Sequence, residues 1–190
     1  MEEINQNLFL KLNSFVGINH WIDSFGILCA EYMPILFILV EVYLFFILKK
    51  KNIAIFTFMS MALALGINQV VGLLYFHNRP FIDGLGHTIL NHLPENSFPS
   101  DHTTFMFSIA IYLYIKLENK IIGESLLILS LIGGLSRVFV GIHYPFDILG
   151  SIFISLITFF IINKFEFKLQ VVNDFIFKIE EKFIIKLQGE

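Results

Sequence analysis

Residues 53–76 read IAIFTFMSMALALGINQVVGLLYF and contain no charged side chain. A helix of this length rises about 1.5 Å per residue and can cross about 30 Å of hydrocarbon. The stretch therefore predicts a membrane-spanning helix. Its second half carries small and amide residues, namely Gly66, Asn68, Gln69 and Gly72. Such side chains indicate close helix packing near a polar site.

The composition extends this interpretation to the whole chain. Of its 190 residues 56% are hydrophobic and 15% charged, against about 45 to 50% hydrophobic in soluble domains. We expect one membrane-embedded domain over residues 1–190, with no nucleic-acid partner. The single cysteine, Cys29, excludes an intramolecular disulfide.

Further apolar runs predict the remaining helices of an all-α polytopic bundle of about five to six helices. Pro34 can begin or kink the first of them. The two ends carry apolar residues at helical spacing and predict amphipathic interfacial helices. The predicted spans are 27–48, 53–76, 103–117, 121–142 and 146–162, and the interfacial ends are 1–20 and 164–190.

The basic residues lie mostly on one side of this five-span arrangement. Ten of the thirteen occupy the 49–51 loop, the 116–120 turn and the tail, which includes Lys182 and Lys186. By the positive-inside rule that side faces the cytoplasm. The opposite side holds all six histidines, His20, His77, His87, His92, His102 and His143.

The segment SFPSDHTT, residues 97–104, leads from a long polar loop into a predicted helix. The first N–H groups of such a helix lack intrahelical partners and lie at the positive end of its dipole, so they favour an anion. Ser100 can add a hydroxyl, and His102 can protonate a leaving group. We expect Asp101 to cap the helix or to pair with an arginine.

Residues 136–147 form a second candidate segment. Arg137, near the end of a span, needs an anion or a carboxylate. In a continuous helix His143 lies about 9 Å beyond it, and Asp147 can fix the tautomer of His143. The alternative is a structural ion pair of Arg137 with Glu41 or Asp147.

Arg79, in the pair Arg79-Pro80, follows the span at 53–76. Its guanidinium can grip two phosphate oxygens. Glu41, in mid-span, is either a protonated packing residue or a partner of Asn68 and Gln69. Three segments suited to phosphate thus reach one face of the predicted bundle.

In order and spacing these three segments resemble the type-2 phosphatidic acid phosphatase superfamily of membrane lipid phosphatases. The resemblance extends over residues 27–162. Asp101, the run at 75–81 and the runs at 140–145 and 147–151 are similar to the bacitracin-resistance type of undecaprenyl-diphosphatase.

The resemblance implies a role for each residue. His143 takes the phosphoryl group as a phosphohistidine, Asp147 orients it, and His102 protonates the leaving oxygen and then activates water. Phosphate is held by the remaining matched residues, Arg79, Arg137, Ser100 and backbone amides near Asp101, with Ser136 in support. The scheme requires neither metal nor cofactor.

One position departs from the resemblance. The superfamily places a lysine seven residues before Arg79, where this chain has Gly72. The phosphate-gripping role of that lysine is therefore either missing or filled by another residue, such as His77. The loss favours the undecaprenyl-diphosphatase branch.

The leading hypothesis is hydrolysis of undecaprenyl diphosphate, a polyprenyl diphosphate lipid, at the outer face of a bacterial plasma membrane. This activity recycles the carrier for cell-wall polymers. Alternatives are a phosphatase for another lipid such as phosphatidylglycerol phosphate, a small ion transporter or channel, and a zinc site built from His102, His143 and Asp147.

Overall fold

The computed structural model describes residues 1–188, with side chains described through Ile179. Within this part of the chain there are six helices and no strand, which confirms the predicted all-α class. Lys182 and Lys186 of the predicted basic tail lie outside the described side chains. The helices are α1 (Glu2–Asn13), α2 (His20–Phe46), α3 (Lys51–Leu74), α4 (Asp101–Lys116), α5 (Lys120–Phe139) and α6 (Pro145–Gln188).

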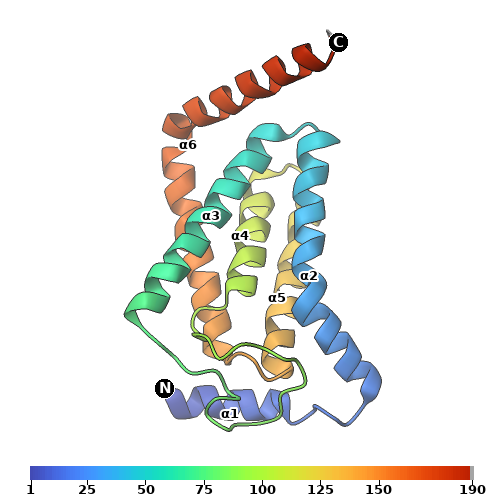
Figure 1. The fold of residues 1–190 in the computed structure, drawn as a ribbon, viewed down its shortest axis with the longest axis vertical. Helices are drawn as coiled ribbons and strands as arrows, with labels where there is room; N and C mark the ends of the chain where they lie inside the picture. Colours follow the sequence, from blue (N-terminus) through green and yellow to red (C-terminus); the bar gives the residue numbers. More distant parts are fainter. Residues whose placement is uncertain (189–190) are drawn as a thin grey trace.

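Helix α4 is the centre of the bundle. It contacts α2, α3, α5 and α6, and Figure 1 shows it enclosed by its neighbours. Its residues are apolar or small on every side, as a fully surrounded helix requires. Met106, Ala110 and Leu113 are completely buried.

Four helices, α2, α3, α5 and α6, are long and apolar enough to cross a membrane. The chain is therefore a multi-pass membrane protein. Helix α4 corresponds to the predicted span at 103–117, but it has only 16 residues and is shorter than these four helices. It lies inside the bundle, shielded by the helices that meet the lipid.

Helix α2 begins at His20 rather than near residue 27 and continues through Pro34 to Phe46. Asn19 caps its first turn, since the Asn19 side chain accepts a hydrogen bond from the Trp21 N–H. In Figure 1 the helix changes direction along its length, as a proline without an N–H allows.

Helix α5 ends at Phe139, earlier than the predicted span at 121–142. Gly141 then adopts φ +90°, and a side chain there would collide with the His87 carbonyl. His143 therefore lies in a turn and not on the helix that carries Arg137, so the predicted 9 Å separation along one helix was wrong.

Helix α1 lies across the end of the bundle beside the 75–100 loop (Figure 1). Its buried residues are Asn5, Phe9 and Asn13. Ile4 and Leu8 are largely exposed, as expected for the apolar face of an interfacial helix. Hydrogen-bonding amides and one aromatic ring, rather than the apolar stripe, attach α1 to the bundle.

Helix α6 joins the predicted fifth span and the predicted tail into one helix of 44 residues. Its last part, red in Figure 1, turns away from the bundle. The described part of this extension exposes Phe167, Val171 and Phe175, and Lys164 and Lys168 lie along it.

Candidate active site

The loop between α3 and α4 brings Arg79 to the head of α6. Its backbone is pinned where the Ser97 N–H donates to the His77 carbonyl over 2.8 Å. Arg79 is buried, and its guanidinium donates to the carbonyls of Ile142, over 3.0 Å, and Asn96, over 3.2 Å. The predicted phosphate ligand is thus held on two sides by backbone.

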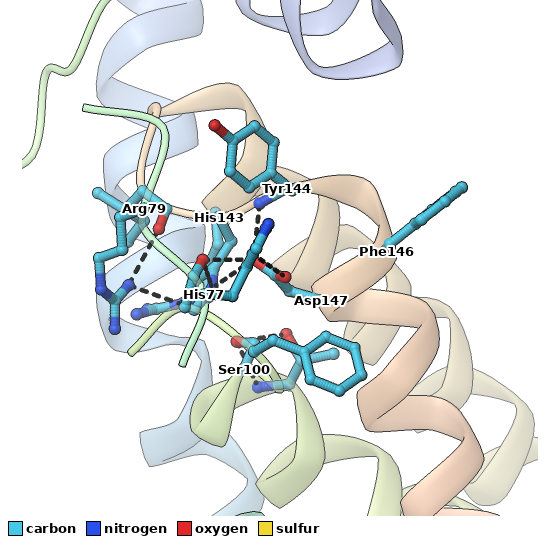
Figure 2. A network of polar contacts seen from close by, with 12 residues as sticks. His77, Arg79, Ser100, His143, Tyr144, Phe146 and Asp147 are labelled. Carbon is cyan, nitrogen blue, oxygen red and sulfur yellow. Dashed lines mark hydrogen bonds and ion pairs between the residues drawn. The ribbon is translucent and has the colours of Figure 1, made fainter. Parts of the chain in front are cut away.

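His143 lies between Arg79 and Asp147, as Figure 2 shows. Its Nε2 is 3.1 Å from Nη1 of Arg79, and its Nδ1 is 3.2 Å from Oδ2 of Asp147. Because a guanidinium only donates and a carboxylate only accepts, Nδ1 carries the proton and Nε2 keeps its lone pair. Burial lowers the pKa of His143 well below its usual value, so the ring is neutral.

Asp147, in the first turn of α6, receives several donors on one oxygen. Oδ2 accepts from the Tyr144 N–H over 2.8 Å and from the Ser97 hydroxyl as well as from His143. Asp147 is fully buried. The carboxylate therefore holds the tautomer of His143, as the sequence predicted for this pair.

Arg137, on α5, is buried and binds α2. Its Nη1 donates over 2.7 Å to the Ala30 carbonyl. Pro34, four residues after Ala30, has no N–H to occupy that carbonyl. The alternative ion pair with Glu41 or Asp147 is absent among the described contacts of Arg137, and its Nε has no partner there.

A second histidine, His92, approaches Arg137 from the loop. Its Nδ1 is 3.1 Å from the Leu93 carbonyl, so Nδ1 donates, and Nε2 can accept from Nη2 of Arg137 at 3.4 Å. Burial lowers the pKa of His92. Burial, and then the charges of Arg137, His92 and Arg79, lower the pKa of His102 to about 4. The two predicted arginines and His102 therefore lie near one another at one end of the bundle.

The head of α4 has the predicted anion-binding form. Ser100 is the N-cap, and its hydroxyl accepts from both the N–H and the hydroxyl of Thr103. The N–H groups of Asp101 and His102 have no intrahelical acceptor because they lie in the first turn. Two such first-turn amides favour an anion at the head of a helix.

Asp101 neither caps the helix nor pairs with an arginine, which corrects both expectations. Its carboxylate accepts from Asn68 Nδ2 over 2.8 Å and from Gln69 Nε2 over 3.3 Å. Asn68 also donates to the Thr104 hydroxyl. The amides of α3 therefore bind the head of α4 near the polar site, as predicted from residues 53–76.

Two other predicted residues lie elsewhere. The Ser136 hydroxyl contacts the thiol of Cys29 on α2, so it supports the packing of α5 against α2. Glu41 lines an apolar cavity of about 570 Å³ formed with residues of α3 and α4. One carboxylate oxygen of Glu41 has no partner among the described residues, and Asn68 and Gln69 bind Asp101 instead.

Asn96 lies beside Gly72, the position at which the superfamily has a lysine. A side chain at Gly72 would meet the Asn96 amide at about 3.1 Å. Asn96 accepts from the His77 N–H and donates to the Phe98 carbonyl, so it secures the loop. Nδ1 of His77 lies 3.7 Å from Oδ1 of Asp147, so its ring is directed at that carboxylate. The expectation that His77 grips phosphate stays a prediction.

From the sequence we did not predict that Ser97 and His77 approach Asp147, or that His92 approaches Arg137. Their loop was noted as long and polar, which is a functional signal, but spacing alone does not show which of its side chains point inward. Within the described residues no group of three or more His, Cys, Asp or Glu is placed to hold a metal, so the alternative zinc site has no support.

Known proteins are similar to this chain over most of its length. Undecaprenyl-diphosphatase BcrC of Bacillus subtilis (strain 168) is 33% identical over 97% of this chain and 95% of its own length. The putative undecaprenyl-diphosphatase YbjG of Escherichia coli (strain K12) is 30% identical over 83% of this chain and 80% of its own.

Among solved structures, Aquifex aeolicus LpxE matches with a TM-score of 0.70 and 24% identity, over 85% of this chain and 95% of that one. Residues 53–170 match the PAP2 superfamily. This segment contains the Arg79 loop, the head of α4 and the His143–Asp147 pair. On these grounds the chain belongs to the PAP2 superfamily.

Proposed function

We propose that this PAP2-family lipid phosphatase hydrolyses undecaprenyl diphosphate to undecaprenyl phosphate and inorganic phosphate. The observation that carries the proposal is the orientation of His143. Its unprotonated Nε2 faces Arg79, while Asp147 holds the opposite nitrogen. A neutral imidazole fixed in this tautomer is a nucleophile beside a phosphate-binding cation.

In the proposed reaction Nε2 of His143 attacks the terminal phosphorus and the bridging P–O bond breaks. Arg79 and Arg137 bind the oxygens where negative charge spreads, with the Ser100 hydroxyl and the first amides of α4. The bound diphosphate offsets the arginine charges that lower the pKa of His102, so His102 is protonated in the complex and gives this proton to the departing lipid phosphate. It then takes a proton from the water that cleaves the phosphohistidine and releases phosphate.

Two observations support a polyprenyl diphosphate as the substrate, namely the relatives and the surroundings of the site. Two relatives named as an undecaprenyl-diphosphatase and a putative one match most of the chain. The site lies at the end of a bundle whose outer helices expose apolar side chains to lipid. A polyprenyl diphosphate can present its terminal phosphate there while its tail stays among the lipids.

The purified protein in detergent should release phosphate from a polyprenyl diphosphate without added metal, and His143→Ala should abolish release. The reason is that no other group replaces the attacking nitrogen. The measurement is the initial rate of phosphate release from a panel that includes phosphatidylglycerol phosphate.

His87→Ala is the matched control, because this exposed loop residue contributes backbone contacts through its N–H and carbonyl. It should keep the wild-type rate. Full turnover by the His143 variant would contradict the proposed mechanism. A higher rate on phosphatidylglycerol phosphate would move the assignment to that lipid, and ion flux in proteoliposomes without phosphate release would replace it with transport.

We also propose that the site faces the outside of a bacterial plasma membrane. The 49–51 loop and the turn between α4 and α5 carry lysines at the end of the bundle opposite α1 (Figure 1). This distribution supports a cytoplasmic position for that end.

A further inference from the structure

Asp147 has a second neighbour that the proposed reaction does not use. Its Oδ1 is buried and has no hydrogen-bond partner among the described residues, and Nδ1 of His77 lies 3.7 Å from it, also without a partner. An unpaired oxygen of a buried carboxylate is costly. Since no other ionisable donor is placed at that oxygen in the described part of the chain, His77 is its natural partner.

The position of His77 is strongly determined. Its N–H donates to the Asn96 side chain over 2.7 Å, and its carbonyl accepts from the Ser97 N–H. The ring lies between aromatic side chains, with centroids 6.0 Å from Tyr75 and 5.2 Å from Tyr144. Only 15% of the His77 side chain is exposed.

The other edge of the His77 ring faces α1. Nε2 of His77 is 3.6 Å from a carboxylate oxygen of Glu2. The four residues Glu2, His77, Asp147 and His143 thus form a row in which carboxylates and imidazoles alternate. The row leads from the interfacial helix to the proposed nucleophile, and Figure 2 shows its inner three members.

We infer that His77 is a positioning residue, which holds Asp147 by Oδ1 so that Oδ2 stays directed at His143, and that Glu2 supports it. The inference rests on the proposed function, because it concerns the orientation of the proposed nucleophile. With donors on one oxygen only, the carboxylate can rotate about its terminal bond. A donor on each oxygen prevents this rotation and so keeps the imidazole of His143 oriented for its attack.

The protonation of His77 makes the inference measurable. The neighbouring Asp147 carboxylate raises the pKa of His77, burial opposes the shift, and the charge of Glu2 raises the pKa further. The charged groups that face the ring are Asp147 of α6 and Glu2 of α1, and Asp83 of the loop lines the same outer hollow. Protonated His77 binds Asp147 most strongly, so kcat should fall as pH rises through the raised pKa.

The test compares kcat and KM of the full-length protein across pH, with phosphate release from a polyprenyl diphosphate as the readout. His77→Asn should lower kcat by about tenfold to a hundredfold with little change in KM, as loss of an orienting partner does. It should also remove the alkaline decline that His77 causes. His87→Asn, the same substitution at an exposed histidine of the same loop, should match the wild type.

Glu2→Gln is the second variant, and it leaves the three inner residues His77, Asp147 and His143 unchanged. Without the Glu2 charge the pKa of His77 falls, so the alkaline decline should move to lower pH while kcat in acid stays near the wild-type value. This variant decides the matter if His77→Asn does not fold.

Three results would overturn the inference. They are a wild-type pH profile in both variants, an unchanged kcat in a folded His77→Asn protein, and a rise in KM alone, which would make His77 a substrate ligand. Each of them requires a wild-type protein that releases phosphate. Absence of phosphate release from every lipid by the wild type would reject the proposed function, and with it the inference.

Discussion

Arg137 depends on a local feature of another helix. A helix interior normally uses each carbonyl for the N–H four residues later. Pro34 cannot donate, so the Ala30 carbonyl is free to accept the Arg137 guanidinium over 2.7 Å. The second nitrogen of the guanidinium approaches His92. Pro34 in α2 thus leaves free a backbone carbonyl, which binds Arg137 of α5 in place of a carboxylate.

Pro34→Ala should therefore separate stability from activity. The new N–H can bond to the Ala30 carbonyl and relieve a helix-interior proline, a change of as much as about 3 kcal/mol in favour of the folded state. The same bond competes with Arg137, and kcat/KM should fall about tenfold, the equivalent of one hydrogen bond to a charged group. Thermal unfolding in detergent and phosphate release measure the two effects.

Ile35→Ala, at an exposed neighbour on α2, is the control for a shortened side chain and should change neither quantity by much. Equal kcat/KM for Pro34→Ala and the wild type would show that Arg137 does not need this carbonyl.

At the scale of residues, the sequence predicts those members of the site that chemistry makes conspicuous. Arg137 is conspicuous because charge is rare in a span, and His143 and Asp147 because their spacing matches an orienting pair. The sequence does not predict Ser97 or His92, because a polar loop residue is ordinary until the loop folds back. It misplaced the side chain of Asp101, because the amides of α3 that bind this carboxylate are distant in sequence.

Among the elements, α1 shows how a short helix can be fixed by amides. The Asn13 side chain donates to the carbonyls of His87 and Phe139, each over 2.8 Å, and accepts from the His87 N–H over 2.6 Å. Asn5 accepts from the Phe146 N–H at the head of α6. Helix α1 therefore binds backbone groups of the 75–100 loop, of the end of α5 and of the start of α6, all beside the site.

Asn13→Leu should weaken the attachment of α1 to the bundle. Three backbone groups lose their partner, and each buried group left unpaired costs about 1–3 kcal/mol. The unfolding midpoint in detergent should fall, and the 75–100 loop should become more sensitive to protease. Asn7→Leu makes the same change at an exposed position of α1 and should behave like the wild type. A normal midpoint for the Asn13 variant would contradict the role given to α1.

Hydrophobic periodicity predicts the helices well where lipid or core surrounds them, as for α3. It does not predict helix ends that are set by hydrogen bonds or by turn geometry rather than by apolar spacing. Helix α5 stops at Phe139 although apolar residues continue, because Gly141 turns the chain at positive φ. Periodicity also cannot show that α6 continues past the predicted fifth span. No Gly or Pro separates the membrane-spanning part of this helix from the surface part that follows.

For the whole molecule, the proposed orientation can be tested with cysteines. Cys29 is buried and is the chain's single native cysteine, so an introduced cysteine at an exposed position is the reactive thiol. Asn91→Cys in the outer loop should react with a membrane-impermeant maleimide in intact cells. Lys50→Cys should react only after the membrane is opened. The reverse pattern would place the site in the cytoplasm and reject carrier recycling at the outer face.

The length of the central helix sets the depth of the site. Sixteen residues of α4 extend about 24 Å at 1.5 Å each, against about 30 Å of hydrocarbon. In the proposed orientation Lys116 lies at the inner boundary, and the proposed phosphate-binding head of α4 is then several ångströms below the outer headgroup plane. A diphosphate anchored by a long tail would reach it by sliding sideways within its own leaflet, and water-soluble phosphates of similar charge would have to descend from the aqueous phase.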